Sequence, residues 1–130
     1  MPSYLPHKFQ RIHVELTNRC NFSCAFCPDG IMTRKRRTMP ESLAKSALDQ
    51  ISELGLAEKV TFHVMGEPLL HPKFFDIMDH AASKNLPVGL TTNGALLKPS
   101  TIQDLAGRDL HQIDISLQTP DKESFHQTRG

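Results

Sequence analysis

"RIHVELTNRCNFSCAFC", residues 11 to 27, joins an alternating run of apolar and polar residues to three closely spaced cysteines. Polar residues separate Ile12, Val14 and Leu16, a spacing that is typical of a β-strand. The chain of 130 residues holds no other cysteine, and an odd number of thiols on one short loop fits poorly with a disulfide framework. The stretch therefore predicts a strand that leads directly into a loop of reduced, ligand-binding thiols.

The same alternation recurs three times further along the chain, and each run is followed by a stretch with helical periodicity. The predicted strands cover residues 11–17, 59–65, 86–93 and 111–118, and the predicted helices cover 38–54, 73–85, 98–107 and 120–127. Thr38 and Glu41 have capping-box spacing at the first helix, Gly107 marks the end of the third, and Pro120 lies just inside the fourth. A strand-helix order repeated four times predicts parallel strands joined by right-handed crossovers.

Side-chain alternation distinguishes between two folds of this kind. A doubly wound sheet buries both faces, so its strands read as continuous apolar runs, whereas each strand here has one apolar and one polar face. The apolar face comprises Ile12, Val14, Leu16, Val60, Phe62, Val64, Val88, Leu90, Ile113, Ile115 and Leu117. We expect this face to pack on the helices and the polar face to line a wet cavity, unless the polar face is simply exposed. The predicted fold is α/β, a partial (β/α) TIM-like barrel of about four β-α units.

The helices should contribute apolar stripes to the same core. On the first two helices the predicted buried faces are Leu43, Ala47, Leu48, Ile51 and Leu54, and Phe74, Ile77, Met78, Ala81 and Ala82. In parallel α/β barrels the functional residues lie where the strands end. The four predicted strands run into the cysteine loop, "MGEPLLHP", "TTNG" and "SLQTP". All four unusual stretches are therefore predicted at one rim of the sheet.

Composition excludes several other classes of protein. Fifteen Lys and Arg residues against fourteen Asp and Glu give a net charge of +1, so nothing draws the chain generally to nucleic acid or to a membrane surface. The basic run "RKRR", residues 34–37, is interpreted as a solvated loop. No apolar stretch approaches the length of a membrane span, and the first ten residues lack a signal-peptide core. We expect a cytoplasmic protein that does not bind membranes, with nucleic acid an improbable partner.

Three thiolates suit an open metal cluster better than a closed zinc site. Structural zinc prefers four protein ligands, whereas a cubane [4Fe-4S] cluster held by three thiolates keeps one iron free for a substrate or cofactor. At this point the sequence resembles the radical S-adenosylmethionine (SAM) superfamily, whose signature is CxxxCxxC with an aromatic residue before the last cysteine. Cys20, Cys24 and Cys27 have this spacing, and Phe26 stands at the aromatic position. The resemblance implies a [4Fe-4S] cluster on these three cysteines and Phe26 beside the cofactor.

The resemblance also implies a set of SAM-binding residues along the rim. Gly66 and Glu67 would take the amino group of SAM, with Met65 standing where the family usually has a further glycine. Ser116 and Asn93 would border its ribose and methionine moieties. The remaining implied SAM contacts are Gln118, where many members have aspartate, and Arg129, for the SAM carboxylate.

The implied activity is radical chemistry. A reduced cluster would cleave SAM to methionine and a 5′-deoxyadenosyl radical, which abstracts hydrogen from an unknown small-molecule or peptide substrate, and an external donor would supply the electron. No side chain is singled out as catalytic. The family core usually has six β-α units, so four units would leave the last strand as an open edge. We expect an N-terminal extension at residues 1–10 and, at 11–130, the N-terminal portion of a longer core.

Two alternatives belong to other functional classes. One is a structural zinc module in which His63 or His71 completes the three cysteines, although neither has the spacing of a zinc knuckle. The other is a non-catalytic iron-sulfur or binding domain that keeps the fold without radical chemistry. Metal analysis separates zinc from iron, and SAM cleavage separates an enzyme from a binding domain.

Overall fold

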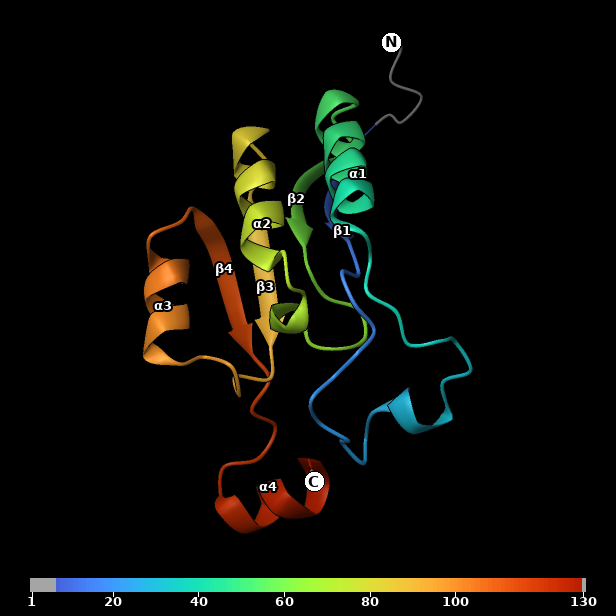
Figure 1. Ribbon diagram of the computed structural model, residues 1–130, viewed down its shortest axis with the longest axis vertical. Coiled ribbons are helices and arrows are strands. Elements are labelled where there is room, and N and C mark those ends of the chain that lie inside the picture. The colour runs from blue at the N-terminus through green and yellow to red at the C-terminus, as the bar shows by residue number, and fades with distance from the viewer. Residues whose placement is uncertain (1–6, 130) are drawn as a thin grey trace.

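The computed structural model of the protein describes residues 7–129 and has the predicted alternation of strands and helices (Figure 1). The elements are β1 (Phe9–His13), η1 (Pro28–Ile31), α1 (Glu41–Glu53), β2 (Ala57–Thr61), η2 (Pro68–Leu70), α2 (Phe74–Ser83), β3 (Val88–Thr92), α3 (Pro99–Ala106), β4 (Leu110–Ile115) and α4 (Lys122–Arg129), η1 and η2 being short 3₁₀ helices. The strands form one sheet in the order β1-β2-β3-β4, and each neighbouring pair is parallel. This confirms the predicted fold class, an α/β sheet of four β-α units.

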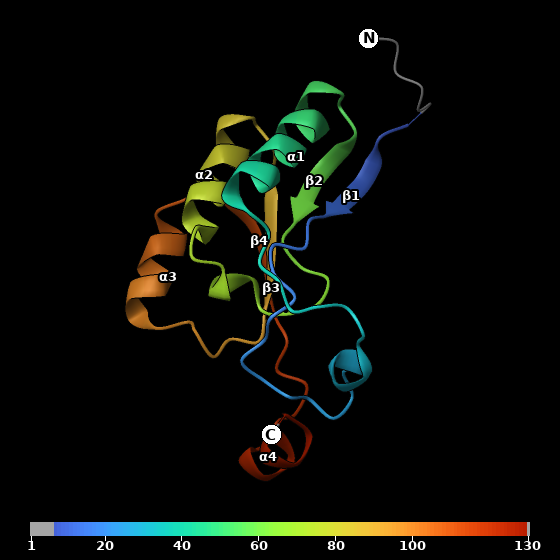
Figure 2. The same cartoon turned by 45° about the vertical axis from the view of Figure 1, so that its right-hand side comes forward.

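Helices α1 and α2 cover one face of the sheet (Figures 1 and 2). The core between these layers comprises Val14, Leu16, Ala44, Leu48, Ile51, Ala57, Val60, Phe62, Phe74, Ile77, Met78, Ala81, Leu86, Val88, Leu90 and Leu105. The predicted face of α2 is largely confirmed, but Leu43 and Leu54 of α1 are 55% and 43% exposed. That part of the prediction is wrong because α1 buries the narrower stripe of Ala44, Leu48 and Ile51.

The ends of several elements differ from the sequence prediction. β1 begins at Phe9, two residues before its predicted start. Both β1 and β2 end four residues before their predicted ends, because the backbone stops pairing with the neighbouring strand while the apolar-polar alternation continues into the loop. The predicted capping box of α1 is also wrong. Pro40 is the N-cap residue and no side chain caps the helix, while the Thr38 hydroxyl lies 3.1 Å from the Thr17 hydroxyl.

Helix α4 lies beyond the carboxyl ends of the strands, beside the cysteine loop, and does not cover the sheet (Figures 1 and 2). Its Thr128 carbonyl accepts a hydrogen bond from the Ala25 amide at 2.7 Å. The helix begins at Lys122, so the prediction that Pro120 lies just inside it is wrong. Asp121 precedes the first turn, and its carboxylate accepts from the Ser124 amide. The predicted packing of the apolar strand face is wrong at β4, which α4 leaves uncovered, and in the segments that follow β2 and β4. The exposed members of that face are Val64, Ile113, Ile115 and Leu117.

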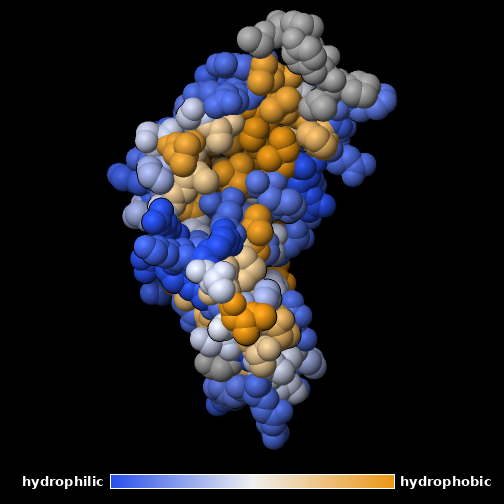
Figure 3. Space-filling model, turned by 90° about the vertical axis from the view of Figure 1, so that its right-hand side faces the viewer, coloured by the Kyte–Doolittle hydropathy of each residue, from blue (hydrophilic) through white to orange (hydrophobic). Residues whose placement is uncertain are grey.

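The third helix ends as predicted, with Gly107 as its C-cap residue. On the face that carries η1, strongly hydrophilic side chains gather across the middle of the molecule, between apolar areas above and below (Figure 3). None of the helices in residues 7–129 is long and apolar enough to cross a membrane.

Candidate functional site

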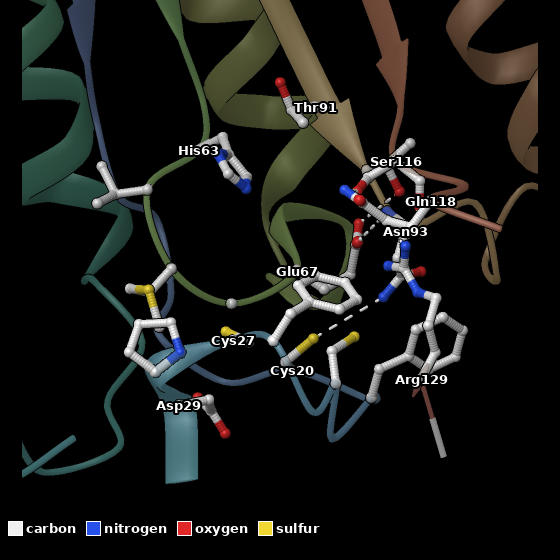
Figure 4. Close-up of a pocket in the computed structure, with 18 residues that line it drawn as sticks. Cys20, Cys27, Asp29, His63, Glu67, Thr91, Asn93, Ser116, Gln118 and Arg129 are labelled. Carbon is white, nitrogen blue, oxygen red and sulfur yellow. Dashed lines mark hydrogen bonds between the residues drawn. The ribbon is translucent and has the colours of Figure 1, made fainter. Parts of the chain in front are cut away.

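A cavity of about 280 Å³ opens at the carboxyl ends of the strands (Figure 4). Its wall comes from the cysteine loop, the loop after β2, the end of β3, the segment after β4, and α4. The lining residues are Cys20, Phe22, Cys24, Phe26, Cys27, Pro28, Asp29, His63, Val64, Met65, Gly66, Glu67, Thr91, Thr92, Asn93, Ser116, Gln118 and Arg129. The structure therefore brings every predicted site residue to one cavity, although their roles toward a ligand remain predictions.

The three cysteines are free thiols on the same wall of this cavity. Burial raises the pKa of the Cys20 thiol, and the nearby Glu67 charge acts in the same direction, so binding a metal at Cys20 would displace a proton. Within residues 7–129 no three His, Cys, Asp or Glu side chains are gathered closely enough to hold an ion. The donor set fits an iron-sulfur cluster in its chemistry, since three unpaired thiols face one space.

Gly66 lies where the loop after β2 crosses the start of the cysteine loop. Its φ is +78°, and a Cβ at this position would lie 2.5 Å from the carbonyl oxygens of both Thr17 and Arg19. Only glycine accommodates this approach without backbone movement. Met65, where the family usually has glycine, is absent from the described positive-φ residues, so its side chain causes no comparable strain. Its amide donates to Glu15 Oε2 at 2.8 Å.

Glu67 is a buried carboxylate, 1% exposed, that joins two strand ends. Its Oε1 accepts from the Thr92 hydroxyl at 2.7 Å and from the Leu69 amide at 3.2 Å. Its Oε2 accepts from the Asn93 amide at 2.8 Å, and its own amide donates to the Arg19 carbonyl at 2.7 Å. The protein thus fixes the direction of this carboxylate, which lines the cavity, before any ligand binds.

Asn93 connects the end of β3 to the cysteine loop. Its Nδ2 donates to Asn21 Oδ1 at 2.7 Å and lies 3.8 Å from the Cys20 sulfur, a weaker contact drawn in Figure 4. Its Oδ1 accepts from the Ala95 amide at 3.0 Å. Asn93 therefore orients the loop on which the first cysteine lies.

The β4 side of the cavity is held by fewer contacts. Gln118 is exposed, has φ +70°, and donates from Nε2 to the Ser116 hydroxyl at 2.9 Å. Ser116 is half-buried and its amide donates to the Thr92 carbonyl at 2.8 Å. Both side chains face the cavity lined by the cysteines, so they remain available to a ligand.

Arg129 lies in α4 as a buried cation, 3% exposed. Its guanidinium carbon lies 5.3, 5.6 and 5.9 Å from the ring centres of Phe22, Phe26 and Phe125, distances at which a cation interacts with an aromatic face. Nη1 donates to the Ser116 carbonyl. Within the described part of the chain, buried Nε has no hydrogen-bond partner, so the guanidinium is not fully engaged by the protein and can donate to a ligand.

Sequence reasoning missed several residues of the wall. Phe22 packs edge-on against Phe125 at 5.6 Å, and Thr92 is the buried hydroxyl that binds Glu67. Thr92 falls on the apolar side of the β3 alternation, so no pattern indicated it. His63, which the sequence indicates only as a possible zinc ligand, also lines the cavity. Burial is the main cause that lowers its pKa, which keeps the imidazole neutral at pH 7.

The second histidine of the zinc alternative is not available as a ligand. His71 is buried, its Nε2 lies 2.7 Å from the Met39 carbonyl oxygen, and its Nδ1 accepts from the Lys73 amide at 3.0 Å. Both ring nitrogens are thus engaged in holding the start of α1 and α2 together. This geometry favours a structural role for His71 and leaves His63 as the histidine on the cavity wall.

Residues 34–37 form a loop, as interpreted, in which Arg34, Lys35 and Arg37 are exposed and Arg36 is partly buried, but two of its arginines form ion pairs. Arg34 forms a bidentate pair with Glu15, at 2.7 and 3.2 Å, and Arg36 lies 2.6 Å from Asp29 Oδ1. Burial raises the pKa of Glu15, but the hydrogen bonds from Arg34 and the Met65 amide outweigh it, and the net pKa lies below the ordinary value of 4.5. The run therefore braces the rim of the sheet.

The fold and site define an α/β protein with a three-thiol loop at the carboxyl end of an open parallel sheet. A family model described as the Radical SAM superfamily matches residues 14–130. The chain belongs to this superfamily.

Named relatives and a solved structure agree with this assignment. The chain is 30% identical, over 121 residues, to the S-adenosyl-L-methionine-dependent 2-deoxy-scyllo-inosamine dehydrogenase of Niallia circulans, covering 90% of this chain and 48% of the relative. It is 33% identical, over 110 residues, to a PqqA peptide cyclase of Streptomyces rochei, covering 83% and 29%. The crystal structure of BtrN in complex with AdoMet and 2-DOIA superposes with a TM-score of 0.80 at 25% identity, covering 95% of this chain and 52% of that one. The chain thus spans about half, or less, of the length of these proteins.

Proposed function

We propose that the protein acts as a radical SAM enzyme, with a [4Fe-4S] cluster on Cys20, Cys24 and Cys27 and SAM in the adjoining cavity. One observation carries the proposal: the three free thiols share a cavity with a buried carboxylate, Glu67, whose orientation the protein fixes. Superfamily membership supports the identity of both cofactors. The bound AdoMet in the BtrN crystal structure supports SAM in particular.

When bound, the cluster and SAM would supply one-electron reductive cleavage of SAM and, through it, abstraction of a hydrogen atom from a substrate. The protein's contribution is to bind, orient and exclude water. Cys20, Cys24 and Cys27 hold the cluster, and Phe22 and Phe26 supply apolar surface on the cavity wall beside it. Apolar walls exclude water from a reactive intermediate.

The charges of the cavity suit the amino-acid end of SAM. The Glu67 carboxylate is matched to its ammonium group, and the Arg129 guanidinium, with Nε unpartnered among the described residues, is matched to its carboxylate. Gly66 permits the close backbone approach that places Glu67, and Asn93, Ser116 and Gln118 offer polar groups along the remaining edge. Together these residues would hold the zwitterionic methionine part of SAM between Glu67 and Arg129, across the rim of the sheet.

The substrate and the electron donor are proposed only by class. The matched relatives are named for a dehydrogenase and a peptide cyclase, so the substrate is a small molecule or a peptide. An external donor supplies the electron. We assign residues 9–130 to the radical SAM core, because β1 begins at Phe9 and pairs with β2. The proposed extension is thereby reduced to residues 1–8, of which residues 1–6 lie outside the described range.

The test is anaerobic reconstitution of the full chain with iron and sulfide, followed by reduction with SAM present. The expected result is about four irons per chain, as a cubane cluster requires, and formation of 5′-deoxyadenosine and methionine. Cys24→Ala should lose the cluster and the cleavage together. Ser23→Ala, an exposed neighbour on the same loop, is the matched control and should retain both.

Each contrary outcome identifies an alternative. Stoichiometric zinc without iron would contradict the proposal and favour a structural zinc module that includes His63. A reduced cluster, seen by electron paramagnetic resonance, that cleaves no SAM even with substrate present would instead favour a non-catalytic iron-sulfur domain. Unchanged iron content in Cys24→Ala would show that the loop is not the cluster site.

A further inference from the structure

The cysteine loop is closed at its base by the side chain of Asn18, which is only 5% exposed. Asn18 Nδ2 donates to the Lys35 carbonyl at 2.9 Å, and Oδ1 accepts from the Arg37 amide at 2.7 Å. The Asn18 amide also donates to the Arg37 carbonyl at 3.2 Å. We call this junction of Asn18 with residues 35–37 the neck. All three cysteines lie on the segment between its two sides.

Arg36 connects the neck to the far side of the loop. From the neck its Nη1 donates to the Asn18 carbonyl at 3.1 Å. Across the loop Nη1 lies 2.6 Å from Asp29 Oδ1, and Nη2 donates to the Asp29 carbonyl at 2.8 Å. Asp29 belongs to η1 and follows Cys27 by two residues. One guanidinium therefore joins the start of the loop, the end of the loop and the turn beside the last cysteine.

These contacts form without any thiol as a partner, so they shape the loop independently of bound metal. The Arg36 and Asp29 side chains are 36% and 23% exposed, and burial of this degree strengthens a charge-assisted hydrogen bond relative to a fully solvated one. The neighbours Lys35 and Arg37 carry the same charge but are exposed. Their side chains make no hydrogen bond or ion pair with any residue that the structure describes.

We infer that Arg36 is a positioning residue that holds the cysteine loop in its closed shape before the cluster binds, and thereby retains the cluster afterwards. The inference rests on the proposed function, because it assigns a role toward that same cluster. Arg36 itself touches no reacting group. Its effect passes through the neck and Asp29 to the backbone around Cys27.

The experiment compares Arg36→Gln, Asp29→Asn and Arg37→Gln in the full chain under anaerobic conditions. The first measurement is hydrogen exchange of the metal-free protein at the amides of Cys27 and Met32, which bond to the Cys24 and Asp29 carbonyls. The second is the half-life of the reconstituted cluster in excess iron chelator. Arg37→Gln removes an equal charge next to Arg36 and is the matched control.

Arg36→Gln should raise exchange at these amides and shorten the cluster half-life by about tenfold or more, since the loss of even one of its three charge-assisted contacts corresponds to a factor of about ten. Asp29→Asn should give a smaller effect in the same direction, because the bond from Arg36 to the Asn18 carbonyl remains. Arg37→Gln should stay within about twofold of wild type, as an exposed substitution usually does.

Equal changes in Arg36→Gln and Arg37→Gln would overturn the inference, since net charge alone would then account for the effect. Wild-type exchange and half-life in Asp29→Asn would overturn it as well. If circular dichroism shows that Arg36→Gln does not fold, Asp29→Asn decides the question. A wild-type protein that takes up no iron contradicts the proposed function itself, and the exchange measurement on the metal-free protein still tests the loop.

Discussion

The rim of the sheet is held together in different ways on its two sides. On the side of β1, β2 and β3, which we call the braced side, backbone crosses backbone at Gly66, and buried Glu67 accepts three hydrogen bonds. On the side of β4, which we call the open side, Gln118 is exposed and bonds to Ser116. The comparison indicates that the protein itself forms the part of the site that holds the thiols and the carboxylate. On the open side the protein contributes Arg129 from α4, and the remaining contacts are left to the bound ligand.

The largest difference should appear between two glycines with positive φ: Gly66 on the braced side, and Gly94, where the loop after β3 contacts Ile115 on the open side. Gly66→Ala places a Cβ 2.5 Å from two backbone carbonyls and should cost about 3 kcal/mol or more, because neither carbonyl can move without disturbing the rim. Gly94→Ala, with φ +84°, meets only the Ile115 Cγ2 at 3.2 Å. Since Ile115 is 55% exposed and can shift, the cost should be about 1 kcal/mol, mainly from φ.

Urea unfolding of both variants measures this difference, with Gly107→Ala as the control. Gly107 has negative φ, and its nearest contact lies at 3.4 Å, so alanine there should change stability by about 0.5 kcal/mol or less. Equal losses for Gly66→Ala and Gly94→Ala would show that the two sides are equally rigid.

Glu67→Gln tests whether the buried carboxylate serves both structure and ligand. The substituted amide keeps the volume but turns one acceptor into a donor, opposite either the Asn93 amide or the Thr92 hydroxyl. We expect roughly 1.5–3 kcal/mol of lost stability, and a loss of SAM affinity of about tenfold or more from the missing charge.

Calorimetric SAM binding to the reconstituted protein and urea unfolding separate the two effects. Glu58→Gln, at an exposed position in β2, is the matched control and should change neither. A variant that loses stability but binds SAM with wild-type affinity would restrict Glu67 to bracing the rim.

Glu15→Gln should weaken the braced side in a pH-dependent way. The folded-state pKa of Glu15 lies below its ordinary value of 4.5, so the ionised carboxylate stabilises the fold above that value and loses this contribution as the pH falls through the lower, folded pKa. At neutral pH the variant should be less stable by about 1 kcal/mol, because the amide of Gln weakens the bidentate bond from Arg34 and competes with the bond from the Met65 amide.

Unfolding curves at neutral pH and at a pH well below 4.5 check this prediction. The difference in unfolding free energy between wild type and Glu15→Gln should become smaller in acid, because a protonated carboxyl group and the amide that replaces it are both neutral and similar in shape. A difference in unfolding free energy that stays constant or increases in acid would show that Glu15 does not stabilise the rim as an anion.

The sequence predicted the braced side better than the open side for physical reasons. Alternation identified Val60, Phe62 and Leu90 as core because period-two patterning reports directly on burial in a strand. The same pattern placed Ile113 and Ile115 under a helix, and it failed there because α4 lies beside the cysteine loop and not on the sheet.

Site residues divide in the same way. Every predicted member lines the cavity because parallel strands end at one rim. The contacts of Thr92 and Arg36 depend instead on tertiary approach between segments far apart in the chain, and no local pattern indicates them. Thr91 and Arg37, their neighbours in sequence, are the same residue types but do not make these contacts. Only the structure distinguishes the members of each pair.

The smallest expected effect concerns Gln118, on the open side. Two variants of this residue separate the contribution of its strained backbone from a contact of its side chain with the ligand. Gln118→Gly relieves the left-handed φ of +70° but adds freedom to the unfolded chain, and the two effects offset each other to within about 0.5 kcal/mol. Gln118→Asn keeps a residue that tolerates this φ while shortening the side chain. If the Gln118 amide contacts SAM, both variants should lose about fivefold in affinity, the value of one neutral hydrogen bond, with stability nearly unchanged. Wild-type affinity in both would mean that Gln118 only shapes the turn after β4, and the open side would then owe its ligand contacts to Ser116 and Arg129.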